Sequence, residues 1–201
     1  MIAIIDYQMG NLRSVHNGFV KVGAEASITS DPDVVRRADK VVLPGVGAFE
    51  DAIAELRKIG MDEAIAEVIE RGTPFLGICI GLQLLFEKSY ENGEHAGLGI
   101  LAGDVVRFDP PAEFSVPQMG WNQLQLRQQL PLFDGINDGD YFYFVHSYYV
   151  RPTDSSVIAA VTDYGGEFCS AIGRENLVAT QFHPEKSQKV GLQVLENFAK
   201  W

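Results

Sequence analysis

Short apolar runs bounded by turns divide the first half of the chain into regular elements. These runs predict buried β-strands over residues 2–6, 26–28 and 41–43. A further run predicts a strand from residue 75 that passes through a sharp turn into a helix ending near residue 90. The pattern therefore indicates several short strands that follow one another at intervals long enough to hold helices.

Amphipathic stretches fill those intervals. In the first of them, helical spacing places four apolar residues on one face: Leu12, Val15, Phe19 and Val22. Two further helices are expected over residues 48–58 and 62–71, and a last helix over 190–200. Strands that alternate with helices in this way predict a parallel sheet with helices on both faces. In such sheets ligands bind beyond the carboxyl ends of the strands.

From about residue 99 to residue 183 the chain becomes β-rich, with hairpins and few helical signals. It contains no internal repeat, linker or low-complexity tract, so we expect a single domain over residues 1–201. The predicted fold class is α/β. It combines a mostly parallel central sheet, with helices on both faces, and a β-rich antiparallel C-terminal portion.

Composition narrows the function classes. Of the 201 residues, 46% are hydrophobic and 21% charged, which is ordinary for a globular domain. The formal net charge of −11 argues against nucleic-acid binding, which normally needs a basic patch. No apolar run approaches the roughly 18 residues of a membrane span, so no membrane association is expected. Two cysteines make no disulfide framework, which suits a cytoplasmic protein, and we interpret Cys169 as a packing residue.

Cys79 stands where the strand from residue 75 meets the following helix. Gly77 and Gly81 flank it, so the segment matches a nucleophile elbow with cysteine in place of serine. Glycines relieve the crowding of such a turn, and a helix N-terminus favours thiolate over thiol. We therefore expect an exposed, catalytic cysteine. A structural cysteine in the core is the alternative interpretation.

A base for this nucleophile is found near the other end of the chain. His183 and Glu185 follow a predicted strand over residues 177–182, with Pro184 between them. Proline favours extended geometry in the residue before it, and residues two apart in an extended chain point to the same side. The carboxylate of Glu185 can then orient the imidazole of His183. The predicted triad is Cys79, His183 and Glu185.

A glycine-rich turn follows the strand over residues 41–43. Pro44 ends that strand, and Gly45 and Gly47 allow the backbone to turn with its amide groups exposed. An oxyanion hole needs two such donors, and we assign them to Ile80 and to Val46 or Gly47. A phosphate-binding loop is the competing interpretation, but neither the P-loop nor the dinucleotide-binding glycine pattern is present.

Together these motifs resemble the triad-type, class I glutamine amidotransferases. More narrowly, the chain is similar to the glutaminase subunits of imidazole glycerol phosphate synthases. The segments that carry the narrower resemblance are Asp6–Ser14, Pro44–Phe49, Met119–Asn122, Tyr143–Tyr149 and Gln181–Ser187. The chain departs from the family pattern in three places. Ile80 and Leu82 replace the usual leucine and methionine, and Gln118 stands where a histidine is common.

The resemblance implies hydrolysis of the side-chain amide of L-glutamine through a cysteine thioester, without metal or other cofactor. It further implies that Gly45, Gln83, Ser147 and Tyr148 bind the substrate. From spacing alone, Gln83 is equally well explained as a solvent-facing residue one helical turn after the nucleophile.

The resemblance also implies a partner, a (β/α)₈-barrel cyclase that forms a heterodimer with this chain. The cyclase would use the ammonia to make imidazole glycerol phosphate and aminoimidazole carboxamide ribotide in histidine biosynthesis. Our candidates for the surface facing it are Trp121, Tyr143 and Asn11. Three alternatives stay open: a glutaminase that serves another ammonia-using synthase, a stand-alone cysteine hydrolase, and a catalytically silent binding subunit.

Overall fold

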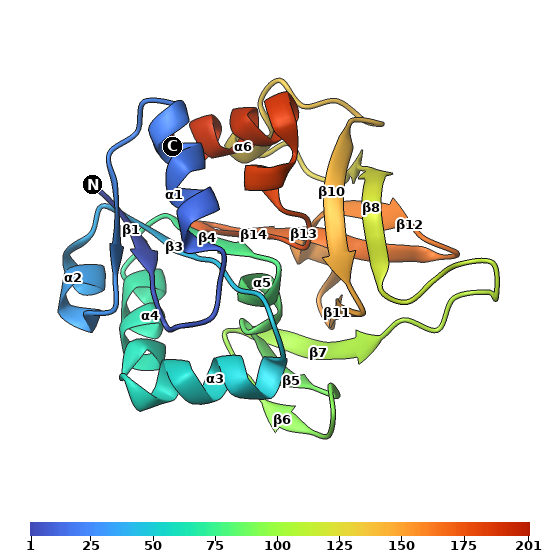
Figure 1. Ribbon diagram of the computed structural model, residues 1–201, viewed down its shortest axis with the longest axis horizontal. Coiled ribbons are helices and arrows are strands. Elements are labelled where there is room, and N and C mark those ends of the chain that lie inside the picture. Colours follow the sequence, from blue (N-terminus) through green and yellow to red (C-terminus); the bar gives the residue numbers. More distant parts are fainter.

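The computed structural model describes all residues, 1–201, and shows a central sheet flanked by helices (Figure 1). Its helices are α1 (Leu12–Lys21), α2 (Pro32–Arg37), α3 (Phe49–Lys58), α4 (Met61–Glu70), α5 (Ile80–Gln83) and α6 (Gln188–Lys200). Short 3₁₀ turns lie at Pro131–Phe133, Ser155–Val157 and Pro184–Lys186. No helix combines the length and the apolar character that spanning a bilayer requires.

Fourteen strands make up two sheets. The strands of the first half are β1 (Ile2–Ile5), β2 (Ala26–Thr29), β3 (Lys40–Leu43), β4 (Phe75–Ile78), β5 (Phe86–Ser89), β6 (His95–Ala96) and β7 (Leu101–Arg107). Those of the second half are β8 (Gln118–Gln123), β9 (Gln125–Leu126), β10 (Tyr141–His146), β11 (Tyr148–Pro152), β12 (Ile158–Asp163), β13 (Glu167–Arg174) and β14 (Leu177–Thr180).

The large sheet has the strand order β2-β1-β3-β4-β14-β13-β11-β7-β5-β6. The strands from β2 to β14 run parallel, while β14, β13, β11 and β7 pair antiparallel. A separate antiparallel pair, β8 and β10, lies beside this sheet (Figure 1). The α/β class, the parallel core and the antiparallel C-terminal portion are thereby confirmed.

The inner strands of the parallel part, β1, β3, β4 and β14, are buried on both faces, whereas the edge strand β2 is partly exposed. In β1, Ala3 and Ile5 belong to one hydrophobic cluster, whereas Ile2 and Ile4 belong to another. The first cluster includes the apolar residues of α3 and α4, and the second those of α1 and α6. The two helix layers on opposite sides of the sheet are visible in Figure 1. Because successive side chains of a strand point to opposite faces, continuous apolar runs are the expected signature of this arrangement.

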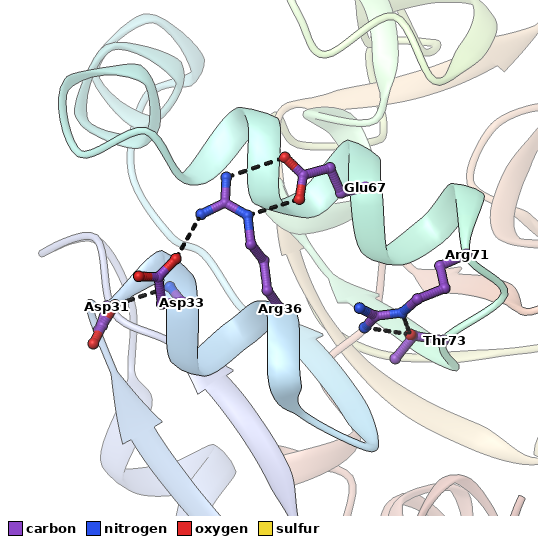
Figure 2. Close-up of polar contacts among 6 residues, drawn as sticks. All are labelled: Asp31, Asp33, Arg36, Glu67, Arg71 and Thr73. Carbon is purple, nitrogen blue, oxygen red and sulfur yellow. Dashed lines mark hydrogen bonds and ion pairs between the residues drawn. The ribbon is translucent and has the colours of Figure 1, made fainter.

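Helix α2 was not predicted from the sequence. Asp31 caps it by accepting a hydrogen bond from the backbone N–H of Asp33, and Pro32 occupies its first turn. The guanidinium of Arg36 then joins α2 to α4 through two hydrogen bonds to Glu67, at 2.7 and 3.2 Å (Figure 2). The Asp-Pro pair was the available signal, but the helix is only six residues long, which is too short for a periodic pattern.

The helix expected to run to residue 90 was wrong. Helix α5 ends at Gln83, and the chain returns to the sheet as β5. The backbone carbonyls of Leu84 and Leu85 accept hydrogen bonds from Leu98 and Ile100, which pulls this segment away from helical geometry. A short, wholly apolar run cannot be assigned to helix or buried strand by periodicity alone. Pairing with distant residues decided it here.

Candidate active site

The elbow at Cys79 has the strained geometry that the glycine spacing predicts. Cys79 joins β4 to α5 with φ of 56° and ψ of −109°, a conformation that a non-glycine residue adopts at a cost of about 1–3 kcal/mol. A Cβ atom added at Gly81 would lie 1.9 Å from the carbonyl oxygen of Leu43, and one added at Gly77 would lie 2.8 Å from that of Gly81. Only glycine fits at either position.

Cys79 is not exposed, contrary to the expectation from the sequence. It is only 4% accessible and lies at a cavity of about 290 Å³. The residues around that cavity are Val46, Gly47, Cys79, Ile80, Gln83, Glu91, Pro117, Val145, His146, Ser147, Tyr148 and His183. A buried sulfur at the wall of a small-molecule-sized cavity suits a nucleophile that must meet its substrate away from bulk water.

His183 and Glu185 meet as predicted, although by a different backbone route. Nδ1 of His183 lies 2.8 Å from Oε1 of Glu185, and both side chains are almost fully buried. The strand ends at Thr180, and Pro184 opens a 3₁₀ turn, so the pair is not held by extended geometry. Ser187 braces this turn: its hydroxyl donates to the carbonyl of His183 and accepts from the N–H of Tyr143 on β10.

The imidazole ring of this pair lies at the same cavity as Cys79. Nε2 of His183 is buried without a hydrogen-bond partner in the protein, and the ring borders the same cavity as the sulfur. Burial by itself lowers the pKa of His183. The charge of Cys79 and the carboxylate of Glu185 raise the pKa by a larger amount, and the resulting value is about 10. No hydrogen bond of standard geometry joins Sγ and Nε2, so the sulfur acts on the ring mainly through charge. The site therefore favours the imidazolium form of His183.

The glycine-rich loop lies opposite the elbow. Strands β3 and β4 are parallel neighbours, so the loop after Leu43 and the elbow after Ile78 emerge at the same sheet edge. The N–H groups of Val46 and Gly47 donate no hydrogen bond within the protein, and both residues border the cavity. Ile80 begins α5, so its N–H has no acceptor inside the helix. These are the three residues predicted to form the oxyanion hole.

Tyr7 anchors the start of this loop. Its buried hydroxyl donates a hydrogen bond to the carbonyl oxygen of Pro44. Gly45 does not border the cavity but packs beneath it, because a Cβ there would lie 2.2 Å from the hydroxyl of Tyr7. Gly47, by contrast, borders the cavity at φ of 103°, which favours glycine.

Gln83, Ser147 and Tyr148 all border the cavity, as expected for substrate contacts. The amide nitrogen of Gln83 is already used, since it donates to the carbonyl of Tyr148 at 3.0 Å and to Oε1 of Gln181 at 3.1 Å. Gln83 can therefore offer only its amide oxygen to a ligand. The competing interpretation of Gln83 as a solvent-facing residue is wrong, because it is 2% exposed.

Sequence reasoning missed four residues of the cavity wall: Glu91, Pro117, Val145 and His146. Glu91 follows β5 and accepts a hydrogen bond from the backbone N–H of Phe49, the first residue of α3. His146 is held between the carbonyl of Tyr148 and the side chain of Gln118. Val145 and His146 lie in the segment Tyr143–Tyr149 that carried the family resemblance, but they were not singled out there. No short motif identifies Glu91 or Pro117, because the segments after β5 and before β8 reach the site only through the tertiary fold. No group of three or more His, Cys, Asp or Glu side chains could hold a metal ion.

The pair of strands β8 and β10 has an aromatic outer surface next to this site. Trp121 lies opposite Tyr143 across the two strands, with ring centroids 6.1 Å apart. Met119, Trp121 and Tyr141 are exposed, and Lys186 lies over the ring of Tyr143. Asn11 is also exposed, but it caps α1 rather than joining this aromatic group.

Several known proteins resemble this chain over nearly its whole length. The family model "Glutamine amidotransferase class-I" matches residues 3–201. The chain is 56% identical to the imidazole glycerol phosphate synthase subunit HisH of Rhodopirellula baltica, over 99% of this chain and 97% of that protein. It is 57% identical to the HisH subunit of Syntrophotalea carbinolica, over 98% of each chain. Among solved structures, PurLQS from Thermotoga maritima superposes with a TM-score of 0.79 at 18% identity, covering 99% of this chain and 97% of that one. The chain therefore belongs to the class-I glutamine amidotransferase family.

Proposed function

We propose that this chain is the glutaminase subunit of an imidazole glycerol phosphate synthase. It hydrolyses L-glutamine to glutamate and ammonia, and a cyclase partner consumes the ammonia in histidine biosynthesis. Relatives more than 50% identical over nearly their full length, whose names state this subunit, support the assignment. The observation that carries the chemistry is the strained elbow of Cys79, at the same cavity as the buried pair of His183 and Glu185.

In the first half of the reaction, the thiolate of Cys79 attacks the Cδ carbonyl carbon of glutamine. The carbonyl π electrons move to oxygen, and the N–H groups of Ile80 and of Val46 or Gly47 stabilise this oxyanion. When the tetrahedral intermediate collapses, the C–N bond breaks and Nε2 of His183 gives its proton to the leaving nitrogen. The products of this half are ammonia and a γ-glutamyl thioester on Cys79.

In the second half, water hydrolyses the thioester. Nε2 of His183, now unprotonated, takes a proton from water as its oxygen attacks the same carbon. The C–S bond then breaks, which returns the thiolate and releases glutamate. Throughout, Oε1 of Glu185 accepts the hydrogen bond from Nδ1, which fixes the tautomer and stabilises the imidazolium.

The cavity wall offers groups of suitable charge for the rest of the substrate. The carboxylate of Glu91 and the amide oxygen of Gln83 are acceptors that suit the α-ammonium group of glutamine. Ser147 and Tyr148 also border the cavity, and we assign them to the α-amino and α-carboxylate end of glutamine. Gly45 supports this subsite indirectly, through its close packing against Tyr7 and Ile80.

We assign the partner to the aromatic surface of β8 and β10, which carries Met119, Trp121 and Tyr141 as exposed apolar side chains. Strand β10 of this pair supplies Val145 and His146 to the cavity wall. A (β/α)₈-barrel cyclase bound there would lie beside the place where ammonia is released. Exposed aromatic residues in one patch are typical of a protein–protein interface.

Covalent trapping tests the chemistry. A glutamine analogue with an electrophilic carbon at the Cδ position should add once to the chain, and digestion should place the adduct on Cys79. The adduct should not form with Cys79→Ala, while the matched control Cys169→Ala should react like the wild type. An adduct on another residue, or none at saturating analogue, would overturn the assignment. Co-purification of a barrel cyclase with the untagged chain tests the partner separately.

A further inference from the structure

The sulfur of Cys79 has one hydrogen-bond donor in the protein that the mechanism above does not use. Nε2 of Gln181 lies 3.7 Å from Sγ, and both side chains are buried. Gln181 follows β14, which runs parallel to β4 with Thr180 opposite Ile78. The next residue of each strand is Gln181 and Cys79, so the sheet register itself brings the amide to the nucleophile.

The direction of this hydrogen bond is fixed by a chain of contacts that begins at a backbone carbonyl. The oxygen of Tyr148 can only accept, so the side chain of Gln83 must present its NH₂ group there. The second hydrogen of that NH₂ group meets Oε1 of Gln181, which is an acceptor. The amide of Gln181 is thereby oriented with its oxygen toward Gln83 and its NH₂ group toward Sγ.

The relay is held in place at its far end as well. At one end, the carbonyl oxygen of Tyr148 also lies 2.8 Å from Nδ1 of His146 and is hydrogen-bonded to it. At the other end, the backbone N–H of Gln181 donates a hydrogen bond to the carbonyl of Ser170. Gln83, Gln181 and His146 are all at most 6% exposed. With both backbone and side chain constrained, the Gln181 amide cannot turn its oxygen to the sulfur without leaving buried groups unpaired.

We propose that Gln181 is a positioning residue for the nucleophile: it donates a hydrogen bond to the thiolate of Cys79 through a buried relay, Tyr148 carbonyl–Gln83–Gln181. This inference rests on the proposed function, because it concerns the same nucleophile. A hydrogen bond from a neutral amide favours the charged form of an acceptor, and it also holds the sulfur in one orientation. Gln181 stabilises the reactive form of Cys79 without touching the substrate.

The test is the pH profile of alkylation of Cys79 by iodoacetamide, which needs no glutamine turnover. Gln181→Met keeps the side-chain length and removes the donor. Its profile midpoint should move upward by about one pH unit, equal to a roughly tenfold loss of thiolate in the rising part of the profile. Gln181→Glu keeps the shape and the acceptor for Gln83 but places an oxygen at the sulfur, and its midpoint should lie higher still. Alkylation is assigned to Cys79 by peptide mapping.

Ser170→Ala is the matched control, because the Ser170 hydroxyl is buried on the adjoining strand and has no hydrogen-bond partner. It should leave the midpoint unchanged. A purely structural role would move the thermal midpoint of the Gln181 variants but not the alkylation midpoint, and would leave Gln181→Glu close to wild type. That result would overturn the proposal. If the wild type failed to hydrolyse glutamine, the proposed function would fail while the alkylation series still tested Gln181.

Discussion

The hydroxyl group of Tyr7 lies 2.9 Å from the carbonyl oxygen of Pro44 and donates a hydrogen bond to it. This contact ties the end of β1 to the loop that supplies the oxyanion donors. Burial raises the pKa of Tyr7, and so does the nearby Cys79, so the phenol stays protonated and remains a donor at any working pH. It fixes the first residue of the loop and leaves the peptides around Val46 free of hydrogen bonds within the protein.

Tyr7→Phe should lower the free energy of unfolding by about 1–3 kcal/mol, because the Pro44 carbonyl loses its partner in a buried place. It should also reduce kcat more than it raises KM, since the loop donors act on the transition state. Urea unfolding and glutaminase kinetics measure the two effects. Tyr149→Phe, on a partly buried tyrosine outside the cavity wall, is the control. An unchanged kcat in Tyr7→Phe would contradict a role in loop placement.

Cys79→Ala should abolish glutamine hydrolysis, with a loss of about 10⁴-fold or more, while folding and partner binding persist. The reason is that alanine can occupy the elbow at the same backbone cost as cysteine, whereas it has no nucleophile. Glutamate release and thermal midpoint should be measured on the same preparation. Residual activity within tenfold of the wild type would rule out the triad.

Glu185→Gln should harm kcat/KM less than His183→Ala does. A glutamine oxygen can still accept from Nδ1 of His183 at the observed 2.8 Å, but its charge no longer stabilises the imidazolium. His183→Ala removes the group that moves both protons. The two variants should be compared with the partner present. The opposite ranking would show that the division of roles between these two residues is wrong.

The isolated chain should be a poor glutaminase that its partner, loaded with nucleotide substrate, activates. Gly45 and Gly47 allow the peptide at Val46 to rotate, so that one N–H can point into or away from the oxyanion site. Misplacing one such donor costs about 3–4 kcal/mol of barrier, or a few hundredfold in rate. Turnover should be measured for the chain alone, with partner, and with partner plus its ligand. Equal rates under all three conditions would exclude this form of gating.

Stability should fall as the pH drops from about 6.5 towards 4 because of His146. Burial lowers the pKa of His146 to about 4, although its hydrogen bond to Tyr148 opposes this. Below pH 6.5 the imidazole of His146 binds a proton in the unfolded chain, whereas it stays neutral in the folded protein. This difference lowers the free energy of unfolding by about 2 kcal/mol between pH 7 and pH 5. His183, with a raised pKa of about 10, is protonated in the folded protein throughout this window.

The free energy of unfolding in urea should be compared at pH 7 and pH 5 for the wild type and His146→Asn. Asparagine keeps a donor near the Tyr148 carbonyl but does not titrate. Carboxylates contribute equally to both proteins, so the difference between the two pH slopes isolates His146. Parallel slopes would mean that His146 is not held neutral in the folded protein.

The elements with strong local signals could be predicted from the sequence. Helices α3 and α4 lie within one residue of the expected ranges, because their apolar positions repeat at 3.6-residue spacing over ten residues each. The elbow could be predicted because the glycine spacing around Cys79 is a local sequence pattern. The carbonyl oxygen that excludes a Cβ atom at Gly81 nevertheless belongs to Leu43 on the neighbouring strand β3. The glycine-rich loop could likewise be predicted, because it needs backbone freedom at Gly47.

Other features depended on residues that are distant in the chain. Strand β5 was mistaken for helix because its pairing with β6 and β7, not local spacing, determines its backbone. Burial of Cys79 also arises from distant segments, since β10 and the turn after β14 close the cavity around it. The local sequence around an apolar run or a reactive side chain does not indicate which distant segments will bury it in the folded protein.

The sequence alone determined which residue types could do the chemistry: a cysteine between two glycines, and a histidine followed two residues later by a carboxylate. Only the tertiary structure decided how they meet. The parallel register of β14 and β4 brings Gln181 to the sulfur, and a 3₁₀ turn brings Glu185 to His183. The physical reason is that hydrogen-bond directions and burial are properties of pairs of segments, and those pairs form only when the sheet is complete.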